Sequence, residues 1–287
     1  MARKLAEFGV LNIVANPHPD GTYINALTHV SGGTGVNFWG DQYAAITSPR
    51  EAEDKIFSGR IVLWTKIDEE APAINLKKLE EVPIEKSGAN LPIDIGFNGK
   101  IFSYYFNPKT HILIFEIKNE FDKRLSPLRC EKIFELLLSP ERLPDNSPLF
   151  DVTTIPEDDT VEKILSLPKL RKIAIHLKRP NPDDVERDVQ SVLDDLQAQG
   201  AKSQNIELVR APKFEKLNLN AINSLYARVA ASNGYVEGIG QSTSGEIIKQ
   251  STKQHPKTFK ARLDEAISLT ARAVRIARDF RIPPPKK

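Results

Sequence analysis

The chain has 287 residues, of which 40% are hydrophobic and 27% charged, and this composition excludes a largely disordered protein. The formal net charge is only +2, and the single cysteine excludes an intramolecular disulfide and a cysteine-rich zinc site. No apolar run approaches the ~18 residues of a membrane span, and the first residues carry no long apolar stretch, so we expect a cytoplasmic protein without membrane contact.

The first half of the chain is predicted to be rich in strands. Its clearest element is a hairpin, in which Lys100–Asn107 and His111–Lys118 carry aromatic and β-branched residues on either side of a short polar turn. A helix is expected to start at Pro127, because Ser126 can cap it and apolar residues follow at helical spacing. The other elements expected here are strands at Glu7–Asn16, Tyr43–Thr47 and Arg60–Ile67 and a short helix at Tyr23–Val30.

The second half is predicted to alternate strands with helices. The strongest helix begins at Pro182 behind the capping residue Asn181 and ends before Gly200. The strands expected are Leu149–Ile155, Arg171–Lys178 and Ile206–Arg210, followed by a hairpin of Tyr235–Gly240 and Glu246–Lys249. The other helices expected are Thr160–Leu167, Asn220–Ser232 and a final one at roughly Phe259–Phe280.

These elements predict an α+β fold with two domains. Residues 1–143 would form a β-rich N-terminal domain with a closing helix. Residues 144–287 would form a smaller βαβαβ-type α/β domain that ends in a basic C-terminal helical arm. The boundary is placed in the polar, proline-bearing segment Pro140–Pro148.

The basic residues are concentrated at the C-terminal end. From Glu246 to Lys287 the chain has eleven basic and four acidic residues, a net charge of +7 that leaves −5 for the remainder. Arginine forks and lysine ammonium groups suit phosphate oxygens, so this arm predicts contact with double-stranded DNA or another nucleic acid. The residues expected to contact phosphates are Lys249, Lys253, Lys257, Lys260, Arg262, Arg272, Arg275 and Arg278.

The same arm motivates the prediction of a homodimer. One arm with about six or seven phosphate contacts would bind weakly near physiological salt, and a second copy would raise avidity by ~100-fold or more. The final helix has an apolar stripe, which can serve either as a dimer surface or as part of the core of its own domain. The stripe consists of Leu263, Ile267, Thr270, Val274 and Ala277, with the small residues Ala266 and Ala273 beside it.

Two alternatives to DNA binding remain open at this stage. Glu116-Ile117-Lys118 at the end of an apolar strand, with Asp94 before it, can place two carboxylates on a divalent metal and a lysine near the attacking water of a nuclease. The bland interpretation of these residues is a hairpin edge with charges that face solvent. In the other alternative, the basic arm of a protein-interaction module meets an acidic partner protein. The leading prediction is a protein without catalytic activity, cofactor or metal.

The layout of the chain resembles the RexA-like exclusion proteins of phage lambda and bacterial phage-defence proteins of unknown-function families. The resemblance is one of order, and it covers a hairpin at Gly99–Ile117, a strand at Leu149–Thr154, the block Leu170–Asp195 and a closing basic helix at Ala261–Arg281. It implies a two-domain, non-enzymatic, DNA-binding protein. The sequence has no recognition-helix motif or zinc finger, so we expect DNA binding with little sequence specificity. The resemblance further implies a dimer that acts in abortive antiphage defence, with a possible partner protein of the defence system.

Overall fold

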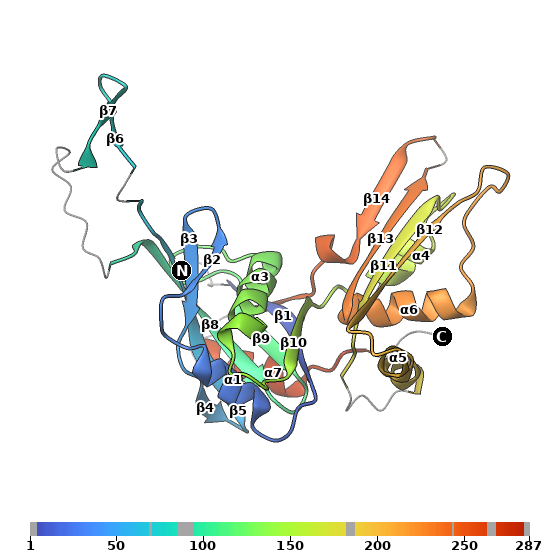
Figure 1. Cartoon of the computed structure of the whole chain (residues 1–287), viewed down its shortest axis with the longest axis horizontal. Helices are drawn as coiled ribbons and strands as arrows, with labels where there is room; N and C mark the ends of the chain where they lie inside the picture. Colours follow the sequence, from blue (N-terminus) through green and yellow to red (C-terminus); the bar gives the residue numbers. More distant parts are fainter. Residues whose placement is uncertain are drawn as a thin grey trace.

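The computed structural model describes residues 5–68, 71–84, 95–181, 187–242, 244–262 and 268–283. Within them the chain forms two lobes, each an antiparallel sheet with helices, that diverge like the arms of a V (Figure 1). The expected α+β fold class is confirmed, and strands and helices alternate along the second half. No helix of the described residues is long and apolar enough to cross a membrane.

The large lobe is built on a nine-stranded antiparallel sheet. Seven strands follow one another across it: β10 (Leu149–Thr154), β1 (Leu5–Asn16), β9 (Ile112–Glu116), β8 (Phe97–Asn107), β5 (Ile56–Thr65), β3 (Gln42–Ile46) and β2 (Val36–Trp39). Two more strands lie off this path, β15 (Thr258–Arg262) beside β1 and β4 (Arg50–Glu53) beside β5. The predicted hairpin is confirmed as the β8–β9 pair.

Helices cover both faces of the large sheet, which explains why β1 is buried along nearly its whole length. α1 (Thr22–His29) and α3 (Pro127–Leu137) pack in one core, and α7 (Leu269–Asp279) packs in the other. α3 begins as predicted, since the Ser126 side chain accepts a hydrogen bond from the Arg129 amide at 3.4 Å. The small hairpin of β6 (Ala73–Asn75) and β7 (Glu80–Val82) projects from this lobe (Figure 1).

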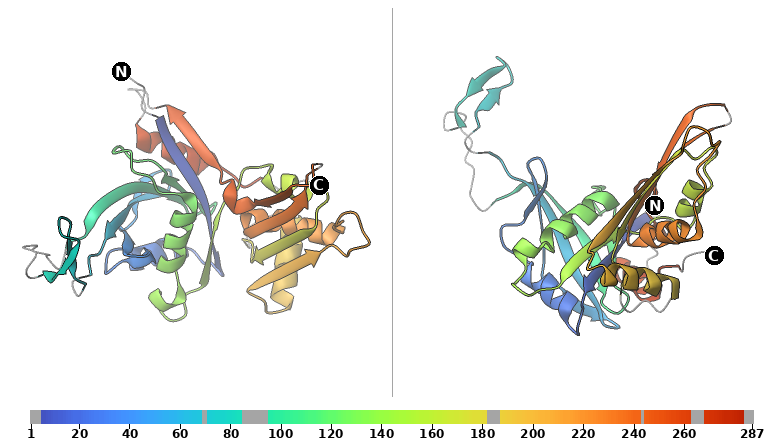
Figure 2. Two further views of the ribbon diagram at one scale, coloured as in Figure 1. Left: turned by 90° about the horizontal axis from the view of Figure 1, so that it is seen from above. Right: turned by 45° about the vertical axis from the view of Figure 1, so that its right-hand side comes forward.

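The small lobe is a four-stranded sheet that carries its helices on one face. The strand order is β12 (Ser203–Val209), β11 (Lys172–Lys178), β13 (Gly234–Gln241) and β14 (Ile247–Ser251), and every pair is antiparallel. α4 (Thr160–Leu165), α5 (Arg187–Ala198) and α6 (Ala221–Ser232) lie on the side away from the large lobe (Figure 2, right). The predicted hairpin at the end of this lobe is confirmed as β13–β14.

The predicted final helix at Phe259–Phe280 is wrong in its first part. Thr258–Arg262 is strand β15, and helix α7 starts only at Leu269. The alternation explains the difference: Phe259 and Ala261 pack against the core that contains α7, which is the two-residue period of a strand. The basic arm is therefore divided among β14, a short 3-10 turn at Thr252–Gln254, β15 and α7.

The small lobe is inserted between two strands of the large sheet. β10 leads into it, β15 leads out of it, and both pair with β1. The two connections lie side by side, because Pro156 and Pro256 form an antiparallel bridge and the Lys257 amide donates to the Ile155 carbonyl at 2.8 Å. β10, β15 and α7 thus belong to the large lobe although they follow residue 144, and the division into domains 1–143 and 144–287 stays a prediction.

Candidate nucleic-acid interface

The small sheet has one face that carries none of its helices, and at one end of this face Lys178 contacts Glu135 and Val152 of the large lobe. Along β11, Ile173, Ile175 and Leu177 are buried against the helices, so the alternate residues point the other way. At opposite edges of that second face, Val209 is 63% exposed and Ile247 is 65% exposed. We call it the open face; it carries Lys172, Ala174, His176, Lys178, Ser203, Asn205, Glu207, Val209, Tyr235, Glu237, Ile239, Gln241, Ile247, Lys249 and Ser251.

An aromatic pair lies on the two central strands of the open face. His176 on β11 is directly opposite Tyr235 on β13, and their rings stack with centroids 4.9 Å apart. On the other side of His176, the Asn205 side chain on β12 forms a hydrogen bond with ring nitrogen Nδ1. The Lys253 ammonium lies 4.2 Å from the Tyr235 ring centroid, within the range of a cation–π contact.

Further lysines lie around the His176–Tyr235 pair. Lys249 is exposed on β14, opposite Ile239. Lys172 pairs with Glu207 at 2.8 Å, and both side chains remain partly exposed, so water screens this pair. Together with Lys178 and Lys253, these residues make four lysines on or beside the open face. The same face carries two glutamates, Glu207 and Glu237.

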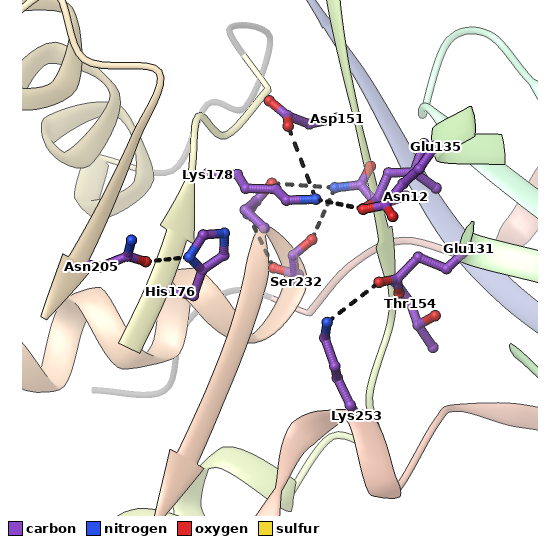
Figure 3. Close-up of polar contacts among 12 residues, drawn as sticks. Asn12, Glu131, Glu135, Asp151, Thr154, His176, Lys178, Asn205, Ser232 and Lys253 are labelled. Atoms are coloured by element: carbon purple, nitrogen blue, oxygen red, sulfur yellow. Dashed lines mark hydrogen bonds and ion pairs between the residues drawn. The ribbon is translucent and has the colours of Figure 1, made fainter. Parts of the chain in front are cut away.

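A cavity of about 420 Å³ lies between the lobes at one end of the open face. The large lobe contributes acidic residues to its lining: Glu135 on α3, Glu141 in the 3-10 turn Pro140–Arg142, and Asp151 on β10. The small lobe contributes His176, Lys178 and Lys202, which are basic. The cavity therefore has an acidic wall and a basic wall, and Glu135, Asp151, Lys178 and His176 are seen together in Figure 3.

Two lysines of the small lobe connect it to acidic residues of the large lobe (Figure 3). Lys178 Nζ lies 3.2 Å from a Glu135 carboxylate oxygen and 4.0 Å from one of Asp151, and it donates to the Val152 carbonyl at 3.0 Å. Lys253 Nζ lies 3.7 Å from Glu131, whose other oxygen accepts a hydrogen bond from the Thr154 amide at 2.7 Å. The contacts of Lys178 join the two walls of the cavity, and the contact of Lys253 with Glu131 joins the lobes outside it.

Burial raises the pKa of Asp151 above its ordinary value, and the carboxylate of Glu135 adds to the shift. The positive charges of Lys178, Lys202 and His176 oppose the shift without cancelling it. A carboxyl group with a raised pKa in the folded state binds its proton more tightly there than in the unfolded chain. Its contribution to stability therefore decreases as the pH rises from the ordinary aspartate range toward neutral.

We expect Asp151→Asn to be more stable than the wild type at pH 7, with a difference that shrinks as the pH falls to about 3, below the ordinary aspartate pKa of ~3.9. Urea unfolding across this range measures the difference. Asp122→Asn, at a side chain that is 78% exposed, is the control and should not follow this pH dependence. A wild type more stable than Asp151→Asn at pH 7 would contradict the expectation.

The predicted phosphate-contacting residues fall into separate groups. Lys249 and Lys253 lie at the open face. Lys257 pairs with Asp158 at 2.7 Å, and Arg278 pairs with Asp54 and Asp279, each at 2.9 Å. The side chain of Arg262 lies outside the described residues. A second cationic group lines a cavity of about 350 Å³ between β15 and α7 and consists of Lys260, Arg272 and Arg275.

The predicted nuclease residues are only partly placed. Glu116 ends β9, is buried and accepts a hydrogen bond from the Ser103 amide at 3.1 Å. Lys118 pairs with Asp122 at 2.7 Å, and Asp94 lies outside the described residues. Among the residues described, no group of three or more histidine, cysteine or acidic side chains could hold a metal ion. The nuclease interpretation stays a prediction, which plasmid incubation with Mg²⁺ and the Glu116→Ala variant would test.

Three residues of the predicted dimer stripe and its neighbours pack inside the chain, whereas Thr270 is exposed. Ala273, Val274 and Ala277 are at most 2% exposed and contact the core beneath α7. Leu263, Ala266 and Ile267 lie outside the described residues. Ala273, Val274 and Ala277 thus belong to the core of the large lobe and offer no dimer surface, while the homodimer stays a prediction.

Sequence reasoning missed the residues that line the open face and the inter-lobe cavity, notably His176, Tyr235, Asp151 and Lys202. The alternation Lys-Ile-Ala-Ile-His-Leu-Lys in β11 was a usable signal, because it implies one apolar and one polar face. The cavity had no such signal, since its two walls come from parts of the chain far apart in sequence.

The fold and the site define a two-lobed α+β protein in which a sheet face that carries no helix lies beside an inter-lobe cavity. The chain belongs to a family described as a domain of unknown function, DUF4747, whose model matches residues 4–278. Comparison with curated proteins finds no match. The family description names no activity.

Proposed function

We propose that this protein binds nucleic acid with little sequence preference and that the open face of the small sheet is the binding surface. One observation carries the proposal: a stacked His176–Tyr235 pair with Lys253 beside it lies on the two central strands of the open face, at the end next to the inter-lobe cavity. Aromatic side chains on a sheet, surrounded by cations, suit the flat bases and the phosphates of nucleic acids. Such contacts depend weakly on base identity.

The lysines give this surface its electrostatic attraction. Lys249 is exposed, and Lys253 and Lys172 reach the same face with partly exposed ammonium groups. Each lysine that neutralises a phosphate releases a counterion, so the affinity should fall steeply with salt. These contacts position a polyanion without discriminating between base pairs.

Fluorescence polarisation of labelled 20-nucleotide single strands and 20-base-pair duplexes, in two unrelated mixed sequences of the same base composition, tests the proposal. We expect binding at about 50 mM salt that weakens steeply by about 200 mM and differs by less than about twofold between the two sequences. The double variant Lys249→Gln/Lys253→Gln should lose about tenfold in affinity and reduce the salt slope by about two.

Lys77→Gln/Lys78→Gln is the matched control, because it removes the same charge from exposed residues of the projecting β6–β7 hairpin. It should change the affinity by less than about twofold. Lack of binding at low salt would overturn the proposed function. If Lys260→Gln/Arg275→Gln abolished binding while the open-face variant did not, the interface would lie between β15 and α7 instead.

The homodimer, the cytoplasmic location and the antiphage role remain proposals that derive from the sequence. Light scattering at micromolar protein concentration measures the mass, and a monomer with intact nucleic-acid binding would refute the dimer. A pull-down with and without nuclease treatment distinguishes a protein partner from retention through nucleic acid. The antiphage role is tested by counting phage plaques on cells that carry the wild-type protein and on cells that carry Lys249→Gln/Lys253→Gln.

A further inference from the structure

We infer that the inter-lobe cavity takes one unpaired nucleotide of a single-stranded nucleic acid, with its phosphate on the basic wall and its base on the acidic wall. The inference rests on the proposed function and specifies its ligand. The cavity adjoins the open face and shares His176, Lys178 and Ser203 with it. A strand lying across the open face therefore reaches the cavity without leaving the surface.

The basic wall suits a phosphate. Lys202 is exposed at the beginning of β12, next to Ser203, and His176 lies on the neighbouring strand. Lys178 is occupied by Glu135 and the Val152 carbonyl, so Lys202 is the cation most open to a ligand phosphate. Its charge also acts on Asp151 across the cavity, which places the two walls within electrostatic reach of each other.

The acidic wall suits the edge of a base that carries an amino group. The carboxylates of Glu135 and Asp151 are hydrogen-bond acceptors, and the apolar side chains of Leu138, Leu149 and Phe150 line the same cavity. Cytosine, adenine and guanine each have an exocyclic amine that donates to such an oxygen, whereas thymine and uracil have none. A cavity of about 420 Å³ is within the usual range for small ligands.

A paired base cannot make these contacts. In a duplex the base is stacked between its neighbours and paired along its edge, and only one amine hydrogen remains free, in a groove, so entry of the base itself into the cavity would require unpairing. The inference therefore predicts a preference for single strands over duplexes. It also predicts a preference for cytosine over thymine, two pyrimidines of similar size that differ in the amine.

Polarisation titrations with labelled (dC)20, labelled (dT)20 and a mixed 20-base-pair duplex at pH 7.5 test this. We expect (dC)20 to bind at least about fivefold more tightly than (dT)20 and about tenfold more tightly than the duplex. The double variant Glu135→Gln/Asp151→Asn replaces carboxylates, which only accept hydrogen bonds, with amides, which both accept and donate. Its ratio of (dC)20 to (dT)20 affinity should therefore fall to about one. This ratio is measured within each protein, so a reduced folded fraction does not alter it.

Lys202→Gln provides a second variant at an exposed position. It should weaken the binding of both single strands by about threefold and leave their ratio unchanged, while Lys77→Gln should change neither. Equal binding of (dC)20 and (dT)20 by the wild type, or a duplex bound as tightly as (dC)20, would overturn the inference and leave the proposed function standing. Failure to bind any of the three probes at low salt would overturn both.

Discussion

Replacing Gly234 with alanine is expected to lower the free energy of unfolding of the small lobe by about 3 kcal/mol or more. Gly234 starts β13 with a φ of 137°, which L side chains rarely adopt. A Cβ atom there would overlap the backbone carbonyl oxygen of His176 on β11. Neither strand can move away easily, because His176 and Tyr235 are paired next to this point.

Gly200→Ala is the matched control for this substitution. Gly200 also has a positive φ, 62°, but a Cβ there would have no neighbour within 4 Å. We therefore expect Gly200→Ala to lower the free energy of unfolding by only about 1 kcal/mol. Urea unfolding followed by circular dichroism gives both values, and hydrogen exchange in β11 and β13 locates the loss. Equal costs for the two alanines would show that the overlap with His176 is relieved without strain.

Lys178→Met is expected to destabilise the protein by about 2 kcal/mol at pH 7, since it removes one side of a largely buried ion cluster. The Lys178 side chain is 17% exposed and that of Asp151 is 15% exposed. Without the ammonium group, the carboxylates of Asp151 and Glu135 and the Val152 carbonyl lose their shared partner. Some water reaches Glu135, at 35% exposure, which keeps the cost below that of a fully buried pair.

The loss should be smaller in acid, because Asp151 already has a raised pKa and takes up a proton readily once Lys178 is gone. Urea unfolding of the variant at pH 7 and at about pH 4.5 measures this difference. Lys172→Met, on the same strand and face, is the control, because its pair with Glu207 is 38% and 58% exposed and should contribute less than about 0.5 kcal/mol. Equal losses for the two variants would contradict a buried role for Lys178.

Local chemistry in the sequence predicted those elements whose signals lie within a few residues. The Ser126–Pro127 start of α3, the β8–β9 hairpin and the β13–β14 hairpin are all present. The Thr258–Arg262 strand was mistaken for helix because it has only five residues. In so short a segment the two-residue and 3.6-residue periods are hard to separate, and pairing with β1 decides the outcome.

The candidate site could not be predicted in the same way, because it depends on pairing between distant segments. His176 and Tyr235 become neighbours only through the register of β11 and β13. The cavity requires β10 and α3 of one lobe to face β11 of the other. The excess of positive charge at the C-terminal end was visible in the sequence. In the fold, ion pairs such as Lys257 with Asp158 neutralise part of this charge.

The two adjacent connections between the lobes also have a mechanical consequence. The small lobe is joined to the large lobe by two neighbouring segments, Ile155–Pro156 and Pro256–Lys257. Two connections of this kind permit a hinge rotation about the line through them and oppose rotation about other axes. Such a swing widens or narrows the V without breaking any strand pair in either sheet (Figure 1). A swing of this kind would have to break the contacts that Lys178, Lys253 and Asn12 make between the lobes (Figure 3).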